Sequence, residues 1–191
     1  MRSISDLLND PSDHTALLFD AFKEHIKIKV VPKGTILQYQ GDQSGTGYYV
    51  KKGLLKSYII DEKGKEHIFM FAPEKWIISD IESQIFDIPS ELFIETLEDS
   101  EIYVLKKELL NQSLLPDHLV KSEVIRLLKR ISVLQKRVIM LMSAPAIKRF
   151  EHFMETYPDI IHRVPQKMIA SYLGITPEAL SKIKSDQFKK P

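Results

Sequence analysis

The spacing of apolar residues changes twice along the chain, and each spacing predicts a different kind of structure. Residues 14–28 carry apolar side chains at helical intervals, so a helix is expected there. From residue 30, short apolar or β-branched runs alternate with Gly, Asp and Pro about every ten residues. That pattern is typical of an antiparallel β-sandwich or barrel. From about residue 115 the helical spacing returns.

One stretch of the β-like region predicts a particular hairpin. In YIIDEKGKEHIFMF, residues 58–71, the polar segment DEKGKE separates two strand-like runs. Glycine within a short polar segment favours a tight turn between antiparallel strands. We therefore expect the chain to reverse direction over residues 61–66.

The first part of the C-terminal helical region has apolar residues spaced alternately by four and three positions. Over about three heptads this spacing is the seam of a short coiled coil, which predicts a dimerisation helix over residues 115–142. The alternative is a single amphipathic helix packed on its own domain. Gln135 lies inside the seam, where a polar residue can fix the register of a dimer. The expected dimer interface consists of Val124, Leu128, Ile131, Gln135 and Val138, and Met142 continues the spacing.

Residues 164–185 contain two short helical patterns separated by a glycine. Pro165 opens the first, QKMIASYL, and Gly174 ends it where a positive φ turns the chain sharply. Thr176 has the hydroxyl of an N-cap, and Pro177 suits the first position of the second helix, PEALSKIKS. This arrangement is the plan of a DNA-binding helix-turn-helix.

The charge of the chain is divided unequally. Residues 1–120 carry 13 Lys and Arg against 20 Asp and Glu, a net charge of −7, whereas residues 121–191 carry 14 against 6, a net charge of +8. A basic region joined to an acidic one suggests that the basic part faces a polyanion. The alternative is that basic helices pair with the acidic domain. Together with the paired helices, the charge favours DNA binding.

The composition excludes several kinds of chemistry. There are no cysteines, which excludes disulfides, thiolate nucleophiles and cysteine-ligated metal sites. No apolar run approaches the roughly 20 residues that span a bilayer, and acidic residues interrupt the N-terminus, so we expect a cytoplasmic protein without membrane contact. Only His67 of the six histidines lies in the β-like region, which argues against a cupin-type metalloenzyme. We expect no enzymatic activity, no metal and no cofactor.

The segment MIASYLGITPEALSKIK resembles the helix-turn-helix of the Crp/Fnr superfamily of bacterial transcription regulators. The segments KGTILQYQGD and YYVKKGLLKSYIIDEKGKEHIFMFAPEKW are similar to that family's cyclic-nucleotide-binding-type β-roll. The resemblance implies an α+β fold with an antiparallel β-roll sensor domain over residues 1–114, the dimerisation helix over 115–142 and a winged helix-turn-helix domain over 143–191. Because the chain stops soon after the second helix, the wing is expected to come from residues before the motif or to be minimal.

The resemblance also implies a function. A homodimer would bind a two-fold DNA operator and regulate transcription, with RNA polymerase as a further partner if it activates. The alternative is a small-molecule-binding β-roll module whose helical C-terminus contacts protein rather than DNA. The expected DNA contacts are Gln166, Lys167, Thr176, Pro177, Glu178, Ser181, Lys182 and Lys184.

In nucleotide-binding members of this family a Gly-Glu pair and a nearby Arg hold the ribose and the cyclic phosphate. Here the first position carries Ser79 and Asp80, the second falls near Ser90 and Glu91, and residues 3–125 contain no arginine. A phosphate needs an arginine or several backbone amides, so no response to cyclic AMP or cyclic GMP is expected. These four residues form a candidate pocket for an unknown small-molecule effector, or one filled by the chain's own side chains. The nearby aromatic residues expected in the core are Trp76, Phe86 and Phe93.

Overall fold

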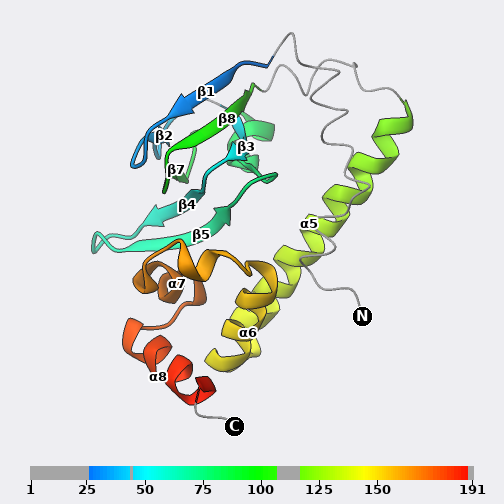
Figure 1. Cartoon of the computed structure of the whole chain (residues 1–191). Helices are drawn as coiled ribbons and strands as arrows, with labels where there is room; N and C mark the ends of the chain where they lie inside the picture. The colour runs from blue at the N-terminus through cyan, green and yellow to red at the C-terminus, as the bar shows by residue number, and fades with distance from the viewer. Residues whose placement is uncertain (1–25, 44, 107–116, 189–191) are drawn as a thin grey trace. The chain divides into compact units, whose positions relative to one another are not determined.

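The computed structural model describes residues 26–43, 45–106 and 117–188 (Figure 1). They fall into two compact units, a β unit described to residue 106 and a helical unit described from residue 117. The helix expected over residues 14–28 lies almost entirely outside the described residues, and its last residue, Ile28, begins a strand instead. No helix within the described ranges combines the length and the apolar run that a membrane span requires.

Two four-stranded sheets make up the described β unit, and neighbouring strands within them are antiparallel. One sheet has the strand order β1-β8-β3-β6 and the other β2-β7-β4-β5. This arrangement confirms the antiparallel β core that the alternation of apolar runs and turn residues predicts. The elements of the unit are β1 (Ile28–Val31), β2 (Ile36–Gln38), β3 (Gly47–Lys52), β4 (Leu55–Ile60), β5 (Glu66–Ala72), β6 (Ile77–Ile78), α3 (Ile81–Phe86), β7 (Phe93–Thr96) and β8 (Ser100–Leu105).

The core of the β unit is built from apolar side chains of both sheets, since successive residues of a strand point to opposite faces. Trp76, directly before β6, packs against this core as expected. Phe86 does not, because it is the last residue of α3 and is 69% exposed. The expectation that Phe86 belongs to the core is therefore wrong. α3 has only six residues and buries the side chain of Ser83 alone, so its end is left uncovered.

The hairpin expected over residues 61–66 is confirmed, because β4 and β5 pair along their length on either side of it. Asp61 holds the turn: its Oδ1 accepts hydrogen bonds from the N–H groups of Lys63 at 2.9 Å and Lys65 at 3.0 Å. Its Oδ2 lies 2.7 Å from His67 Nε2. The hydrogen bond with His67, followed by those from the backbone, holds the pKa of the Asp61 carboxyl below its ordinary value.

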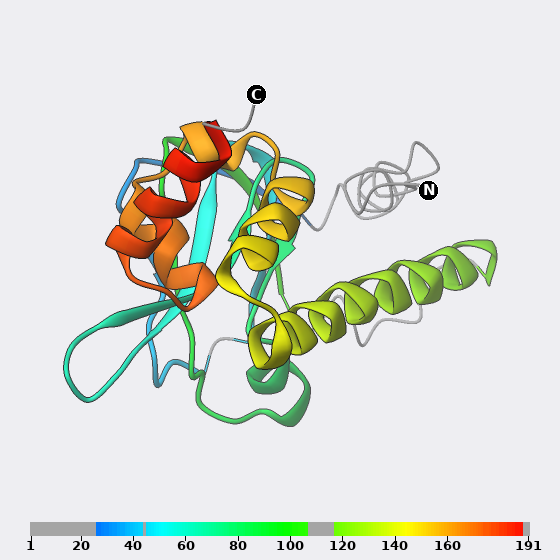
Figure 2. The same cartoon turned by 90° about the horizontal axis from the view of Figure 1, so that it is seen from below.

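Every regular element in the described residues of the second unit is a helix (Figure 2). The long helix expected over residues 115–142 is observed over 117–143, and the two short helices expected within 164–185 are both present, the second extended to residue 188. Residues 144–165 form helical segments and not strands, so they do not supply the expected wing. The elements are α5 (Asp117–Ser143), α6 (Ala146–Thr156), the 3-10 helix η1 (Ile160–His162), α7 (Gln166–Leu173) and α8 (Pro177–Phe188).

Aromatic side chains form the centre of the helical unit. Phe153 of α6 lies 5.4 Å, centroid to centroid, from the rings of both Tyr157 and Tyr172, and the two tyrosine rings are 5.6 Å apart. Rings at these distances and angles attract one another beyond the burial of their area. Leu180 of α8 is also fully buried. The core of this unit therefore draws side chains from α6, α7 and α8.

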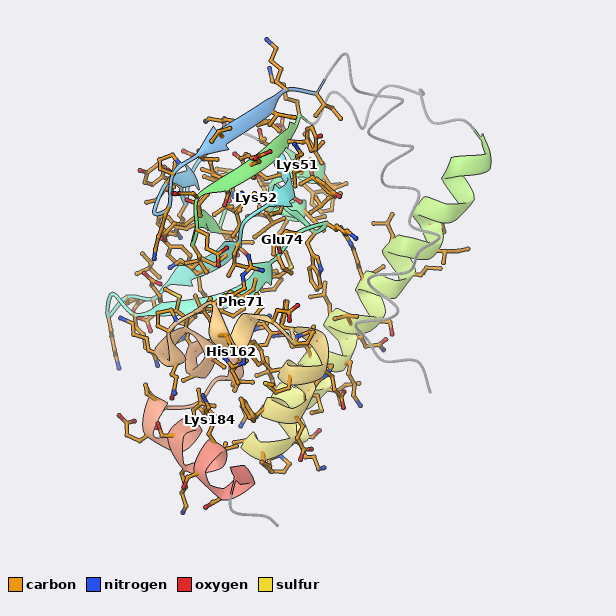
Figure 3. All side chains as sticks on the ribbon, in the orientation of Figure 1. Lys51, Lys52, Phe71, Glu74, His162 and Lys184 are labelled. Atoms are coloured by element: carbon orange, nitrogen blue, oxygen red, sulfur yellow. The ribbon has the colours of Figure 1, made fainter. Side chains whose placement is uncertain are left out.

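Glycine is required at position 53, in the tight turn between β3 and β4. Its φ is +101°, and an added Cβ would collide with the Ser100 hydroxyl and approach Asp99 O to 2.9 Å. Its N–H donates at 3.0 Å to Oε1 of Glu74, a residue labelled in Figure 3. Gly34 also has a positive φ, +79°, but no atom lies within 4 Å of its added Cβ.

We expect Gly53→Ala to lower the free energy of unfolding of the β unit by about 3 kcal/mol or more, because steric overlap adds to backbone strain. Gly34→Ala is the matched control and should cost about 1–2 kcal/mol through its φ alone. Urea unfolding followed by the fluorescence of Trp76, the single tryptophan of the chain, measures both losses. Equal losses in the two variants would contradict the steric argument.

Candidate functional site

The turn between α7 and α8 is closed by hydrogen bonds at both helix ends. Gly174 ends α7 in the left-handed conformation, with φ 65° and ψ 37°. The N–H of Ile175 donates to Ala170 O at 3.0 Å, a bond typical of glycine-terminated helices. The Thr176 hydroxyl accepts a hydrogen bond from the Ala179 N–H at 3.2 Å and so caps α8. The glycine end and the threonine cap are both formed as the sequence predicts.

The expected DNA-contacting residues lie at the start of α7, in the turn and along α8. Seven of the eight are exposed, and Lys184, which is labelled in Figure 3, is half-buried. Together they present amide, hydroxyl, carboxylate and ammonium groups, which can form hydrogen bonds with base edges or phosphates. The set comprises Gln166, Lys167, Thr176, Pro177, Glu178, Ser181, Lys182 and Lys184.

The carboxylate of Glu178 lies at the N-terminal end of α8. Hydrogen bonds from its own backbone N–H and from the Thr176 hydroxyl hold the pKa of Glu178 below its ordinary value. The side chain is therefore ionised at neutral pH and can only accept hydrogen bonds. Such a group is suited to a base amino group and not to a phosphate.

Two arginines from outside α7 bind its C-terminal carbonyl groups. Arg137 of α5 donates to Tyr172 O at 3.3 Å, and Arg149 of α6 donates to Leu173 O at 2.7 Å. The Arg137 guanidinium also lies 4.0 Å from the centre of the Tyr172 ring. Cations at a helix C-terminus satisfy its carbonyl groups and interact favourably with the helix dipole. The two arginines thus tie α5 and α6 to the turn that orients α8.

Sequence reasoning did not find these two contacts, because the arginines are 35 and 24 residues away from their acceptors. Spacing rules describe neighbours within one helix or strand, and they carry no information about such separations. The one available signal was that Arg137 lies off the predicted seam of α5.

Helix α5 exposes apolar side chains on more than one face. Three leucines outside the predicted seam, Leu127, Leu134 and Leu141, are exposed and repeat every seven residues. They follow the β-branched residues of the seam by three positions, whereas the predicted four-then-three spacing that begins at Val124 does not include them. The five residues of the predicted seam are also exposed: Val124, Leu128, Ile131, Gln135 and Val138.

The four residues of the candidate ligand pocket are brought together only in part. Asp80 is buried and caps α3, because its Oδ1 accepts a hydrogen bond from the Ser83 N–H at 3.2 Å. Its Oδ2 accepts from the Ser90 hydroxyl at 2.8 Å and from the Glu91 N–H at 3.0 Å. The Glu91 side chain is exposed and Ser79 is half-buried. Among the described residues, no cluster of three His, Cys, Asp or Glu side chains could hold a metal ion.

The family model of the cyclic nucleotide-binding domain matches residues 28–116. CLP, a c-di-GMP responsive global regulator of Xanthomonas campestris, is 18% identical with a TM-score of 0.70, over 90% of this chain and 91% of its own. FixK2 from Bradyrhizobium japonicum is 15% identical with a TM-score of 0.71, over 86% and 85%. A CooA mutant from Carboxydothermus hydrogenoformans is 16% identical with a TM-score of 0.68, over 98% and 85%. No curated protein sequence matches the chain significantly.

One histidine lies half-buried in the helical unit. His152 of α6 has its Nδ1 4.0 Å from Glu155 Oε2. Burial lowers the pKa of His152 below its ordinary value of 6.5; the Lys136 ammonium acts in the same direction, and the Glu155 carboxylate opposes both. The folded unit therefore favours the neutral imidazole.

Because the pKa of His152 is lower in the folded than in the unfolded chain, the unfolded state takes up more protons as the pH falls. At a pH above 6.5, the pKa of His152 in the unfolded chain, this effect does not reduce the stability of the helical unit. Stability is lost as the pH falls from 6.5 through the lower pKa of His152 in the folded chain. Urea unfolding followed by far-UV circular dichroism at several pH values measures the loss. His152→Gln should flatten this pH dependence, whereas His162→Gln, at an exposed imidazole, should keep it. An unchanged pH dependence in His152→Gln would exclude this role.

Proposed function

We propose that this chain, whose residues 28–116 belong to the cyclic nucleotide-binding domain family and whose fold is that of the Crp/Fnr-type regulators, binds DNA and regulates transcription. The observation that carries the proposal is the exposed polar face of α8. This helix follows a glycine turn, and Arg137 and Arg149 donate hydrogen bonds to the carbonyl groups at the end of α7, directly before that turn. The +8 charge of residues 121–191 supports a polyanionic partner.

α8 is the proposed recognition helix. Its 12 residues extend about 18 Å, and the major groove of B-DNA is about 12 Å wide and admits an α-helix. In the proposed complex Lys182 donates to guanine or phosphate, Ser181 bonds to either, and Glu178 accepts from a cytosine amino group. These residues are exposed and lie within the first two turns of the helix. Lys184, half-buried, supplies charge near the backbone.

The start of α7 and the turn are assigned to the DNA backbone. Gln166 and Lys167 are exposed at the N-terminal end of α7, where they can contact phosphates. The Thr176 hydroxyl already bonds to the Ala179 N–H and to Glu178. We therefore assign Thr176 to positioning Glu178 and not to a base contact of its own.

The proposed regulator is a homodimer joined through α5. Val124, Ile131 and Val138 occupy one heptad position, and Leu127 and Leu134 occupy the position three residues later. β-branched residues at a and leucine at d favour parallel two-stranded coiled coils. This alternation contains no polar residue. We therefore prefer it to the seam that includes Leu128 and Gln135, which shares its three β-branched residues.

The β unit is proposed not to respond to cyclic AMP. No arginine lies within residues 3–125, and the acid at position 80 would repel a phosphate placed near it. An effector of other chemistry, and contact with RNA polymerase in the case of an activator, stay predictions from the family resemblance.

We expect Lys182→Ala to weaken binding to a cognate operator by about 1–3 kcal/mol, because a base or phosphate contact is lost. The operator is first selected from random duplexes with the wild-type protein, and affinity is then measured over a range of salt concentrations. Lys148→Ala is the matched control, since that lysine is exposed on α6 and pairs with Glu151. Wild-type affinity that does not depend on salt would favour the alternative in which the helical unit contacts protein.

The two possible seams of α5 predict opposite results for neighbouring positions. If Leu134 lies in the seam, Leu134→Gln should weaken the dimer by about 2–3 kcal/mol, roughly a hundredfold, while Gln135→Leu has little effect. If Gln135 lies in the seam, Gln135→Leu should instead tighten the dimer. Sedimentation equilibrium of the full chain measures both. A wild-type chain that stays monomeric at high concentration would exclude the dimer.

A further inference from the structure

The side chain of Asp80 is held inside the β unit by four neutral hydrogen-bond donors. Its Oδ2 accepts from the Ser90 hydroxyl at 2.8 Å, the Glu91 N–H at 3.0 Å and the Leu92 N–H at 3.2 Å. Its Oδ1 accepts from the Ser83 N–H at 3.2 Å. Asp80 is only 6% exposed. A buried carboxylate that accepts hydrogen bonds from several donors of the surrounding chain is held in the way a bound anion is held.

Three of these donors belong to one short segment, residues 90–92. Two successive backbone N–H groups and a hydroxyl converge on a single oxygen, as donors do around a bound anion. Gln38 holds the Ser90 hydroxyl in place, because its buried side-chain amide donates to the hydroxyl oxygen at 2.7 Å and to Leu92 O at 2.9 Å. The hydroxyl lies within hydrogen-bond distance of two acceptors, Asp80 Oδ2 at 2.8 Å and Leu92 O at 3.0 Å. The contacts of Gln38 thus fix the position of the segment that carries the three donors.

We propose that residues 90–92 form a binding site for a small carboxylate or phosphate group, and that Asp80 occupies this site as an internal ligand. The bond from position 91 to position 80 ties the start of α3 to the segment before β7. Without Asp80 the Glu91 N–H would lose its acceptor, and the Ser90 hydroxyl and the Leu92 N–H would keep only their bonds within the segment, to Leu92 O at 3.0 Å and to Ser90 Oγ at 3.1 Å. With Asp80 present, a second anion is excluded by space and by repulsion between like charges.

The inference concerns the β unit alone and does not depend on DNA binding. It deepens one part of the proposed function, the lack of response to cyclic nucleotides, and rests on that part. In this β unit the place where a phosphate could find neutral donors is already filled by the chain itself.

Chemical complementation tests the proposal in the full chain. Asp80→Ala removes the carboxylate and leaves a space of about the size of formate, so we expect the melting temperature of the β unit to fall by roughly 5–15 °C. About 0.2 M sodium formate should restore at least half of that loss, compared with sodium chloride at the same ionic strength. Trp76 fluorescence reports the transition, because its ring packs on the core of the same unit. The wild-type protein should melt at the same temperature in both salts.

Two matched variants separate a site from a general salt effect. Asp80→Asn keeps the size of the side chain but replaces one accepting oxygen with an NH2 donor. It should therefore lose stability, and formate should not restore it. Asp61→Ala removes a carboxylate that also accepts two backbone N–H groups, but in a more exposed turn where water replaces it, and it should show no rescue either. Rescue in all three variants, or a folded Asp80→Ala variant that formate does not stabilise, would overturn the proposal.

Asp80→Ala that fails to fold in both salts leaves the decision to a double-mutant cycle. Asp80→Asn and Ser90→Ala both act on the contact between positions 80 and 90, so their combined loss in melting temperature should be clearly smaller than the sum of the single losses. Additive losses would overturn the proposal. Titration calorimetry of the wild-type protein with cyclic AMP tests the proposed function separately. Micromolar binding there would refute the lack of response, while formate rescue would still support the internal ligand.

Discussion

Buried backbone groups at the ends of short segments need hydrogen-bond partners, and both units of this chain supply them with charged side chains from elsewhere. Leaving one such group unpaired costs about 1–3 kcal/mol, a large share of the stability of a small domain. In the β unit, Asp80 accepts hydrogen bonds from N–H groups on two segments. In the helical unit, Arg137 and Arg149 serve the last carbonyl groups of α7. These few charges hold the turns on which the candidate sites are built.

In the proposed regulator, the arginine contacts connect the dimerisation helix α5 to the turn before the recognition helix α8. Arg137 is the neighbour of Val138, which lies in either version of the seam, and its guanidinium binds the end of α7. The Arg137 side chain therefore connects the helix that would join two copies to the turn that orients α8. A two-fold dimer built in this way would present two α8 helices related by symmetry, as a two-fold operator requires.

The β unit illustrates that a fold and the chemistry placed on it are separate matters. The family model of the cyclic nucleotide-binding domain matches residues 28–116, which include the unit's two antiparallel sheets. At the positions where the resemblance implies a ligand, however, a serine and an aspartate bond to each other. A hydroxyl and backbone amides can hold an anion, but here the anion is part of the chain. In the proposed account, the two-sheet fold is present while the donors that could bind a phosphate are bonded to Asp80.

The sequence by itself determined the elements whose cause is local. Alternating apolar runs predicted the antiparallel strands, DEKGKE predicted the β4–β5 turn, and Gly174 with Thr176 predicted the end of α7 and the cap of α8, because each depends on residues within a few positions. Only the tertiary structure decided that Asp80 meets residues 90–92, that two arginines bind the end of α7, and that Phe86 is uncovered. Periodicity describes one element at a time, whereas burial and these hydrogen bonds depend on which distant segments the folded chain brings together.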